Sequence, residues 1–325
     1  MKVLVGTASW SDKSLVNSKK FYPKDVKTPE GRLRYYATQF PLVEVDTSYY
    51  AIPLPETVQA WADRTPAHFT INVKAFRLFT GHATTANVLP PDLREQLPAT
   101  GKSSFYFKNL SEDLRAPLWE RFKASLEPLR AANKLGMVHF QFAPWVIRNR
   151  DGHAHVRHCV EVMRDYTVSV EFRNKTWFDE AHVGATLAFE RDLNVVHTVV
   201  DGPQGFSNSI PSIWESTHMQ YSLVRLHGRN HETWNVKGAK SASERFNYDY
   251  PAKELVEVAA KVERLAPETF TTHVVMNNNW EDQGQRNAAT LIQVLGDRRK
   301  SLVPRLMLPE PDDVEEGSWV IDPQS

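Results

Sequence analysis

The sequence predicts an α/β protein built around a closed (β/α)8 TIM barrel of parallel strands, arranged as a single domain. Short segments rich in β-branched and aromatic residues alternate with amphipathic helical segments along most of the chain. This alternation is typical of βαβ units. The strand-like segments number eight, which favours a closed barrel over an open doubly wound sheet. The expected strands are residues 2–6, 42–46, 69–74, 137–142, 168–172, 195–200, 222–226 and 272–276.

Helical segments with an apolar stripe lie between these strands. Pro117 and Pro251 suit the first turn of a helix, where a missing N–H costs nothing. Asp179 is a residue type that caps helix N-termini. The expected helices are residues 31–39, 55–64, 118–133, 156–164, 180–192, 251–265 and 284–295.

The barrel is expected to occupy residues 1–297, with one long departure from the repeat. About sixty residues separate the third and fourth strands, which is more than a single crossover needs. Residues 79–111, rich in Pro, Thr and Gly, are therefore predicted to form an excursion over one barrel end. Residues 298–325 contain several prolines and an acidic run, so they are predicted to be a C-terminal tail or strap.

Composition narrows the class of protein. Lys plus Arg and Asp plus Glu both number 39, so the formal net charge is zero. That balance argues against bulk electrostatic attraction to nucleic acid or to an anionic membrane. The single cysteine, Cys159, excludes an intramolecular disulfide and a cysteine-based zinc site. The N-terminus does not resemble a signal peptide, and no apolar run approaches about 18 residues. We therefore expect a soluble, cytoplasmic protein with no membrane partner.

A charged pair interrupts the fifth expected strand. In the segment SVEFRNKTW, at 169–177, Val170 and Phe172 alternate with Glu171 and Arg173. Alternate residues of a strand share a face, so the two charged side chains project together. One face of a barrel strand packs on the helices and the other faces the lumen. Because buried charges need partners, we expect this pair in the lumen, within a larger polar group.

Other expected strands also end in polar residues, and this predicts a polar pocket. The active sites of (β/α)8 barrels form at the C-terminal ends of the strands. The polar residues at the other strand ends are Glu44, Asp46, Lys74, Gln141, Asp201, Arg225, His227 and Asn277. Aromatic residues that follow strand ends or lie in rim loops can stack on a sugar or a base, and these are Trp10, Tyr50, Trp145, Trp177 and Trp234.

Roles follow from residue chemistry. Carboxylates and imidazoles can act as general bases and acids when neighbours tune their pKa values, so the candidate catalytic residues are Glu44, Glu171, His227 and Asp201. Cationic side chains can bind a phosphate or carboxylate, and arginine does so with two hydrogen bonds. The candidate substrate-binding residues are Lys74, Gln141, Arg173, Arg225, Arg229, Asn277, His82, Trp10, Tyr50 and Trp177.

A divalent metal stays an alternative. A metal site needs three or more converging His, Asp or Glu ligands. The candidate ligands are Glu44, Asp46, Glu171, Asp201 and His227. Lys74, Arg173 and Arg225 at the same rim would repel a cation. We therefore predict no cofactor and no required metal.

With these residues in order, the sequence resembles the DUF72 family, also called the YecE-like family. The landmarks are GTASW at 6–10, FYP at 21–23, VEVDTSYY at 43–50, FTINVKAF at 69–76, VEFRNKTW at 170–177 and VRLHGR at 224–229, together with Gln141, Asp201 and the asparagine run 277–279. The resemblance covers about residues 3–296. It implies a TIM barrel related in shape to xylose isomerase-like and endonuclease IV-like proteins, with a pocket but no established reaction. Asp46 and the spacing of Thr80 and His82 depart from the usual family pattern.

Three functions stay open. The first is an enzyme that uses acid/base chemistry, as a hydrolase or isomerase, on a phosphorylated or sugar-containing small molecule. The second is a nucleic-acid processing or binding protein, by analogy with endonuclease IV-like barrels. The third is a non-catalytic barrel that binds a ligand. Zero net charge favours the first over the second, so the expected partner is an anionic or sugar-containing small molecule.

Overall fold

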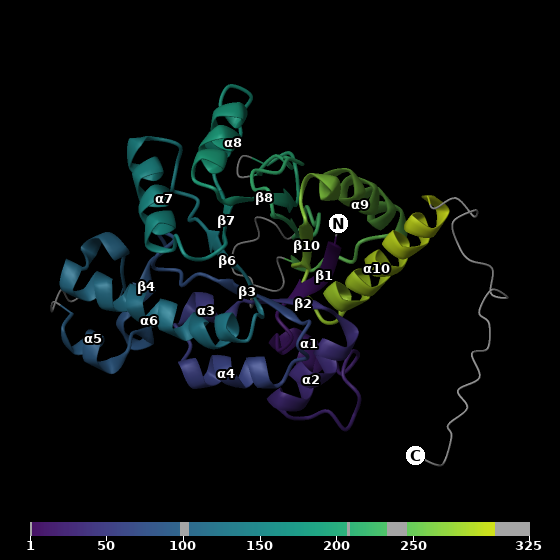
Figure 1. Ribbon diagram of the computed structural model, residues 1–325, viewed down its shortest axis with the longest axis horizontal. Coiled ribbons are helices and arrows are strands. Elements are labelled where there is room, and N and C mark those ends of the chain that lie inside the picture. Colours follow the sequence, from purple (N-terminus) through teal and green to yellow (C-terminus); the bar gives the residue numbers. More distant parts are fainter. Residues whose placement is uncertain (1, 98–103, 207–208, 233–245, 303–325) are drawn as a thin grey trace, which may run out of the picture.

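Eight parallel strands close into a barrel in the computed structural model, which describes residues 2–97, 104–206, 209–232 and 246–302 (Figure 1). Around the barrel the strands follow the order β1-β10-β9-β8-β7-β6-β3-β2. Their bounds are β1 Lys2–Ala8, β2 Leu42–Val45, β3 Thr70–Lys74, β6 Leu135–Gln141, β7 Val168–Glu171, β8 Val196–Asp201, β9 Tyr221–Leu226 and β10 Thr271–Met276. The predicted fold class, a (β/α)8 TIM barrel, is confirmed.

Helices surround the barrel and cover its outer surface (Figure 1). They are α1 Lys13–Ser18, α2 Pro29–Gln39, α3 Thr47–Tyr50, α4 Pro55–Asp63, α6 Glu112–Ala131, α7 Arg150–Val162, α8 Val183–Asp192, α9 Ala252–Leu265 and α10 Gln283–Leu302. Three predicted helix starts are wrong by three residues or more, and one of them is that of α7, which begins at Arg150 and not at residue 156. α6 begins at Glu112 and contains Pro117, and α8 begins at Val183. Asp179 instead closes a turn, in which its carbonyl accepts from the amides of His182 and Val183.

Strand alternation divides the interior into two apolar regions. The large core between strands and helices includes Val43, Val170 and Val224. A smaller apolar cluster lies inside the barrel and includes Leu42 and Leu223. Leu42 precedes Glu44 by two residues, and Leu223 precedes Arg225 by two, so each pair shares the lumen face. The charged residues of the lumen therefore lie toward the C-terminal ends of the strands. The deeper layer combines apolar side chains with the buried, hydrogen-bonded pair His273 and Asn72.

The long segment after β3 builds a small substructure beside α6 (Figure 1). It contains β4 Thr84–Thr85, the 3-10 helix η1 Ala86–Val88, α5 Pro91–Glu95, β5 Ser104–Phe105 and the 3-10 helix η2 Phe107–Asn109. β4 and β5 pair as a short antiparallel ribbon. An ion pair between Asp92 and Arg121 joins α5 to α6. Phe79 stacks on Trp119 of α6, with ring centroids 3.6 Å apart. We call residues 79–111 the excursion.

The C-terminal boundary differs slightly from the prediction. α10 continues to Leu302, beyond the predicted end of the barrel at 297. The rest of the predicted tail, 303–325, lies outside the described residues. Within the described part of the chain, no helix is both long and apolar enough to cross a membrane.

Candidate functional site

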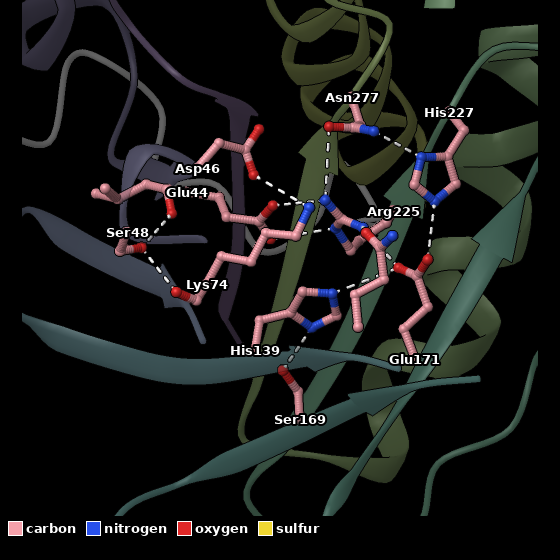
Figure 2. A network of polar contacts seen from close by, with 12 residues as sticks. Glu44, Asp46, Ser48, Lys74, His139, Ser169, Glu171, Arg225, His227 and Asn277 are labelled. Carbon is pink, nitrogen blue, oxygen red and sulfur yellow. Dashed lines mark hydrogen bonds and ion pairs between the residues drawn. The ribbon is translucent and has the colours of Figure 1, made fainter. Parts of the chain in front are cut away.

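Arg225 is the centre of a buried ionic network at the C-terminal end of the lumen (Figure 2). Its Nη2 donates to Oε1 of Glu44 at 2.6 Å and its Nε donates to Oε2 at 3.2 Å. Its Nη1 donates to Oε2 of Glu171 at 2.5 Å. All three side chains are fully buried. One guanidinium from β9 thus joins carboxylates of β2 and β7 across the barrel, where the low dielectric strengthens each charge-assisted hydrogen bond.

Glu171 collects further partners around its two oxygens. Arg173 Nη1 donates to Oε1 at 2.8 Å. His227 Nε2 lies 3.4 Å from Oε1, and His139 Nε2 lies 3.4 Å from Oε2. Burial alone would raise the pKa of Glu171, but the neighbouring Arg225 and His227 outweigh burial and hold that pKa well below its ordinary value. Glu171 is therefore a carboxylate at neutral pH and a weak base, so the network fits an orienting anion better than a general base.

The hydrogen bonds around Asn277 assign the tautomer of His227. Arg225 can only donate, so Oδ1 of Asn277 faces its Nη2, at 3.5 Å. The Nδ2 amide of Asn277 then donates to Nδ1 of His227 at 2.6 Å. A neutral imidazole that accepts at Nδ1 carries its proton on Nε2. Burial lowers the pKa of His227 to about 4, so at neutral pH the ring is neutral. Its Nε2–H is directed at Oε1 of Glu171, 3.4 Å away, and Nη1 of Arg173 lies 3.3 Å from the same nitrogen.

Two further lumen residues complete this network. Gln141 Oε1 accepts from Arg225 Nη1 at 3.4 Å. His139, fully buried on the same face of β6, makes a 3.0 Å hydrogen bond with Ser169 through Nδ1. The network thus contains seven of the predicted site residues, which are Glu44, Gln141, Glu171, Arg173, Arg225, His227 and Asn277.

Lys74 and Asp46 lie at the edge of the network, next to Glu44 (Figure 2). The two charged atoms, Lys74 Nζ and Asp46 Oδ1, are 3.5 Å apart. Lys74 also lies over the ring of Tyr49, with Nζ 4.6 Å from the ring centroid. The side chains of Lys74 and Arg173 are 12% and 15% exposed, so the mouth of the site presents positive charge that the deeper network lacks.

His82 is held near these cations in the opposite tautomer to His227. The hydroxyl of Thr80 donates to the carbonyl of Arg77 at 3.0 Å. That hydroxyl has one proton, so it accepts from Nδ1–H of His82, also at 3.0 Å. The lone pair of His82 is therefore on Nε2. Burial, followed by the charges of Arg77, Lys74 and Arg173, lowers the pKa of His82 to about 4.

Asp201 and Arg229 lie in a separate cluster, away from the site in which the sequence placed them. In the barrel, Val200 pairs with Arg225 and Asp201 pairs with Leu226, so Asp201 is on the helix-facing side of β8. Arg229 binds Asp201 through Nε at 2.9 Å and Nη2 at 2.7 Å. Tyr250 donates its hydroxyl to Asp201 Oδ1 at 2.7 Å. Through these hydrogen bonds the cluster joins the segment between β9 and α9 to the end of β8, so its contribution is structural.

The predicted aromatic residues occupy different environments. Trp177 is fully buried, stacks on Phe172 with ring centroids 3.9 Å apart, and donates its indole N–H to the carbonyl of Val146. Placing Trp177 at the pocket mouth is therefore incorrect, because the ring is part of the core behind β7. Trp10 is also buried, with its ring packed edge-on against Trp61. Tyr50 is 54% exposed beside Tyr49, and Trp234 lies outside the described residues.

The candidate metal ligands do not come together as a set. Among the residues that the structure describes, no group of three or more His, Cys, Asp or Glu is placed to hold a metal ion. Glu44 and Glu171 both bind Arg225, while Asp201 faces the opposite side of the barrel wall.

Sequence reasoning missed three residues that shape this site. His139 contacts Glu171, Tyr49 lies under Lys74, and Thr80 fixes the tautomer of His82. A signal for His139 was present, because it alternates in phase with Gln141. Tyr49 and Thr80 act through contacts between separate segments, and no spacing pattern reveals such contacts.

The closed parallel barrel with polar side chains at its C-terminal strand ends defines a TIM-barrel protein. Within that class, the chain belongs to the DUF72 family. The family model described as "Protein of unknown function DUF72" matches residues 4–312. The UPF0759 protein YunF of Bacillus subtilis (strain 168) is 30% identical over 305 residues, which cover 93% of this chain and 98% of that protein.

Solved structures of the same family share the fold. A DUF72 family protein from Enterococcus faecalis V583 is similar with a TM-score of 0.73 and 25% identity, over 90% of this chain and 95% of that one. A DUF72 family protein from Thermotoga maritima MSB8 gives a TM-score of 0.70 at 26% identity, over 91% of this chain and 100% of that one.

Proposed function

We propose that this protein is an acid/base enzyme, of hydrolase or isomerase type, acting on a small anionic molecule that is phosphorylated or contains a sugar. The observation on which the proposal depends is the pair of neutral imidazoles with opposite tautomers. His227 carries a proton on Nε2, where it faces Glu171, and His82 carries a lone pair on Nε2. Arg173 is among the charges that lower the pKa of each ring.

In this proposal the substrate anion binds at Arg173 and Lys74, at the mouth of the network. Bringing negative charge there offsets the cations that depress the pKa of His82, so substrate binding raises that pKa toward neutrality. A base is most effective when its pKa is near the working pH. His82 Nε2 then removes a proton, and the charges of Arg173 and Lys74 stabilise negative charge that develops on the substrate.

The buried network supports this chemistry without taking part in proton transfer. Glu171 orients Arg173 through Oε1, and Arg225 and Asn277 fix the tautomer of His227. We therefore assign Glu44 and Glu171 to positioning, in place of the general-base role considered from the sequence.

The test is turnover of a library of sugar phosphates and nucleoside phosphates, followed by mass spectrometry, with wild-type protein, His82→Asn and Arg173→Gln. We expect His82→Asn to lower kcat by roughly 10² to 10⁴, the usual contribution of a general base. Arg173→Gln should raise KM. The matched control is His218→Asn, a partly buried histidine in the loop that precedes β9, at the N-terminal end of that strand.

Equal turnover by His82→Asn and His218→Asn would refute the assignment of the base. If wild-type protein binds a library member in an Arg173-dependent way but converts none, the enzyme proposal is wrong and the protein is a ligand-binding barrel.

A further inference from the structure

A second cleft lies between the excursion and the barrel helices. Its volume is about 570 Å³, within the range of roughly 300 to 1,000 Å³ that is usual for small-molecule sites. It is lined by Tyr106, Phe107 and Lys108 of the excursion, Arg115 of α6, Trp145 after β6 and His155 of α7. We call this the excursion cleft. The network around Arg225 does not line it.

Two aromatic rings form an exposed corner of the excursion cleft. Tyr106 is 38% exposed and Trp145 is 57% exposed. Their rings meet edge-on, with centroids 6.3 Å apart and an interplanar angle of 85°. The indole N–H of Trp145 donates to the carbonyl of Gly81 at 2.8 Å, which fixes the orientation of the ring. Fixed, exposed aromatic faces are suited to stacking against a planar group.

Polar groups with unused hydrogen-bonding capacity lie beside these rings. Arg115 is held in place, because its guanidinium lies 5.2 Å from the Phe107 ring centroid and its Nη2 donates to the carbonyl of Lys108 at 3.1 Å. Its Nε is buried without a hydrogen-bond partner among the described residues. The same holds for Nε2 of His155 within that part of the chain. Buried polar atoms of this kind are uncommon in folded proteins and point to a ligand or solvent partner.

The charge of the excursion cleft is positive. Arg115 and Lys108 contribute cations, and none of the described lining residues is Asp or Glu. Glu112 is near Arg115, with 3.8 Å between the charged atoms, but its side chain is 78% exposed. An anionic group entering the cleft would therefore meet Lys108 and Arg115, whose ion pair with the exposed Glu112 is long, next to donors that can bind it.

We propose that the excursion cleft is a binding site for a small planar aromatic anion, stacked on Tyr106 and Trp145 with its anionic group at Arg115. This site is separate from the one in the proposed function and does not depend on it. The two sites are neighbours, because the Trp145 ring also packs edge-on against His82, with centroids 5.5 Å apart. A ligand in the cleft would therefore contact the wall that positions His82.

Isothermal titration calorimetry tests the proposal with two sets of probes. The first set is AMP, adenosine and inorganic phosphate, and the second is indole-3-acetate, indole and acetate. We expect at least one aromatic anion to bind wild-type protein about tenfold more tightly than its neutral and non-aromatic counterparts, which corresponds to roughly 1.4 kcal/mol. Arg115→Gln should remove that preference.

Arg130→Gln is the matched control. Arg130 is on the same helix, forms an i,i+3 ion pair as Arg115 does, and stacks on Tyr166 at 5.0 Å, but it does not line the cleft. Arg173→Gln reports on the network instead, and binding in the cleft should survive both of these changes. If Arg115→Gln fails to fold, Tyr106→Ala tests the stacking face at an exposed position.

Three outcomes would overturn the proposal. In the first, the aromatic anions bind wild-type protein no more tightly than their neutral and non-aromatic counterparts. In the second, Arg115→Gln and Arg130→Gln bind the aromatic anion equally well. In the third, Arg173→Gln abolishes binding of the aromatic anion. Loss of turnover in His82→Asn bears only on the proposed function, so the two ideas can fail independently.

Discussion

Replacing Arg225 with Met tests how much the buried network contributes to stability. The substitution removes a fully buried cation from between two fully buried carboxylates, with its hydrogen bonds of 2.6 and 3.2 Å to Glu44 and of 2.5 Å to Glu171. Removing one partner of a buried ion pair costs about 3 to 5 kcal/mol, because the remaining charge stays desolvated. We therefore expect Arg225→Met to lower the free energy of unfolding by about 4 kcal/mol near neutral pH.

The pH dependence of this loss identifies its cause. In the wild-type chain the pKa of Glu171 is below its ordinary value, so its stabilising contribution is present above that ordinary value and is lost as the pH falls through the lower, folded value. Without Arg225, Glu171 keeps Arg173 at 2.8 Å but loses its fully buried cationic partner, so the pKa of Glu171 rises and the carboxyl takes up a proton more readily in the folded state. The difference between wild type and variant should therefore shrink as the pH falls from about 7 to about 5.

Urea unfolding followed by circular dichroism at both pH values measures the effect, with Arg130→Met as the control. Arg130 is half-exposed and pairs with Glu127 at the surface, so its loss should change stability far less than the loss of Arg225, because solvent screens a surface ion pair. A loss below about 1 kcal/mol in Arg225→Met, or a loss that does not depend on pH, would contradict our account of the network.

Two further predictions follow from the same structure. Trp177→Ala should destabilise the chain by about 3 to 5 kcal/mol, because it removes a fully buried ring from its stack on Phe172. Ligand binding per folded molecule should be unchanged. A variant that folds normally but loses ligand binding would show that Trp177 belongs to the binding site. Burial lowers the pKa of His273 from its ordinary 6.5 to about 3, so unfolding between these values takes up a proton and stability falls on acidification. His273→Asn should flatten the rise of unfolding free energy with pH in this window by up to about 1.4 kcal/mol per pH unit, and denaturant titrations that show an unchanged slope would count against a neutral buried His273.

Strand periodicity explains why much of the site could be predicted. Glu171 and Arg173 alternate with Val170 and Phe172, and this pattern assigned both charged residues to the lumen without any knowledge of their partners. The same rule could not place Asp201, because both phases of VVHTVVD contain a polar residue. Only the pairing of Val200 with Arg225 in the barrel puts Asp201 on the helix-facing side.

Loop residues were harder to place, because no periodicity applies after a strand ends. Trp177 follows β7 by several residues, and the sequence alone did not distinguish an exposed aromatic at the rim from a core residue. The 3-10 helix η3 Lys175–Trp177 turns the chain back, so that the indole lies against Phe172. Burial of the ring in an apolar layer therefore depends on a backbone turn that the local composition does not specify.

The sequence by itself determined the barrel, its eight strands and the lumen face of those strands in which charged and apolar residues alternate, because alternation with a period of two is a local property of the chain. The partners of the charged residues were decided only by tertiary structure. Glu44 and Arg225 are 181 residues apart, and closure of the barrel brings them within hydrogen-bonding distance across the lumen. The tautomers of His82 and His227, on which the proposed chemistry depends, also follow from hydrogen bonds that exist only in the folded chain.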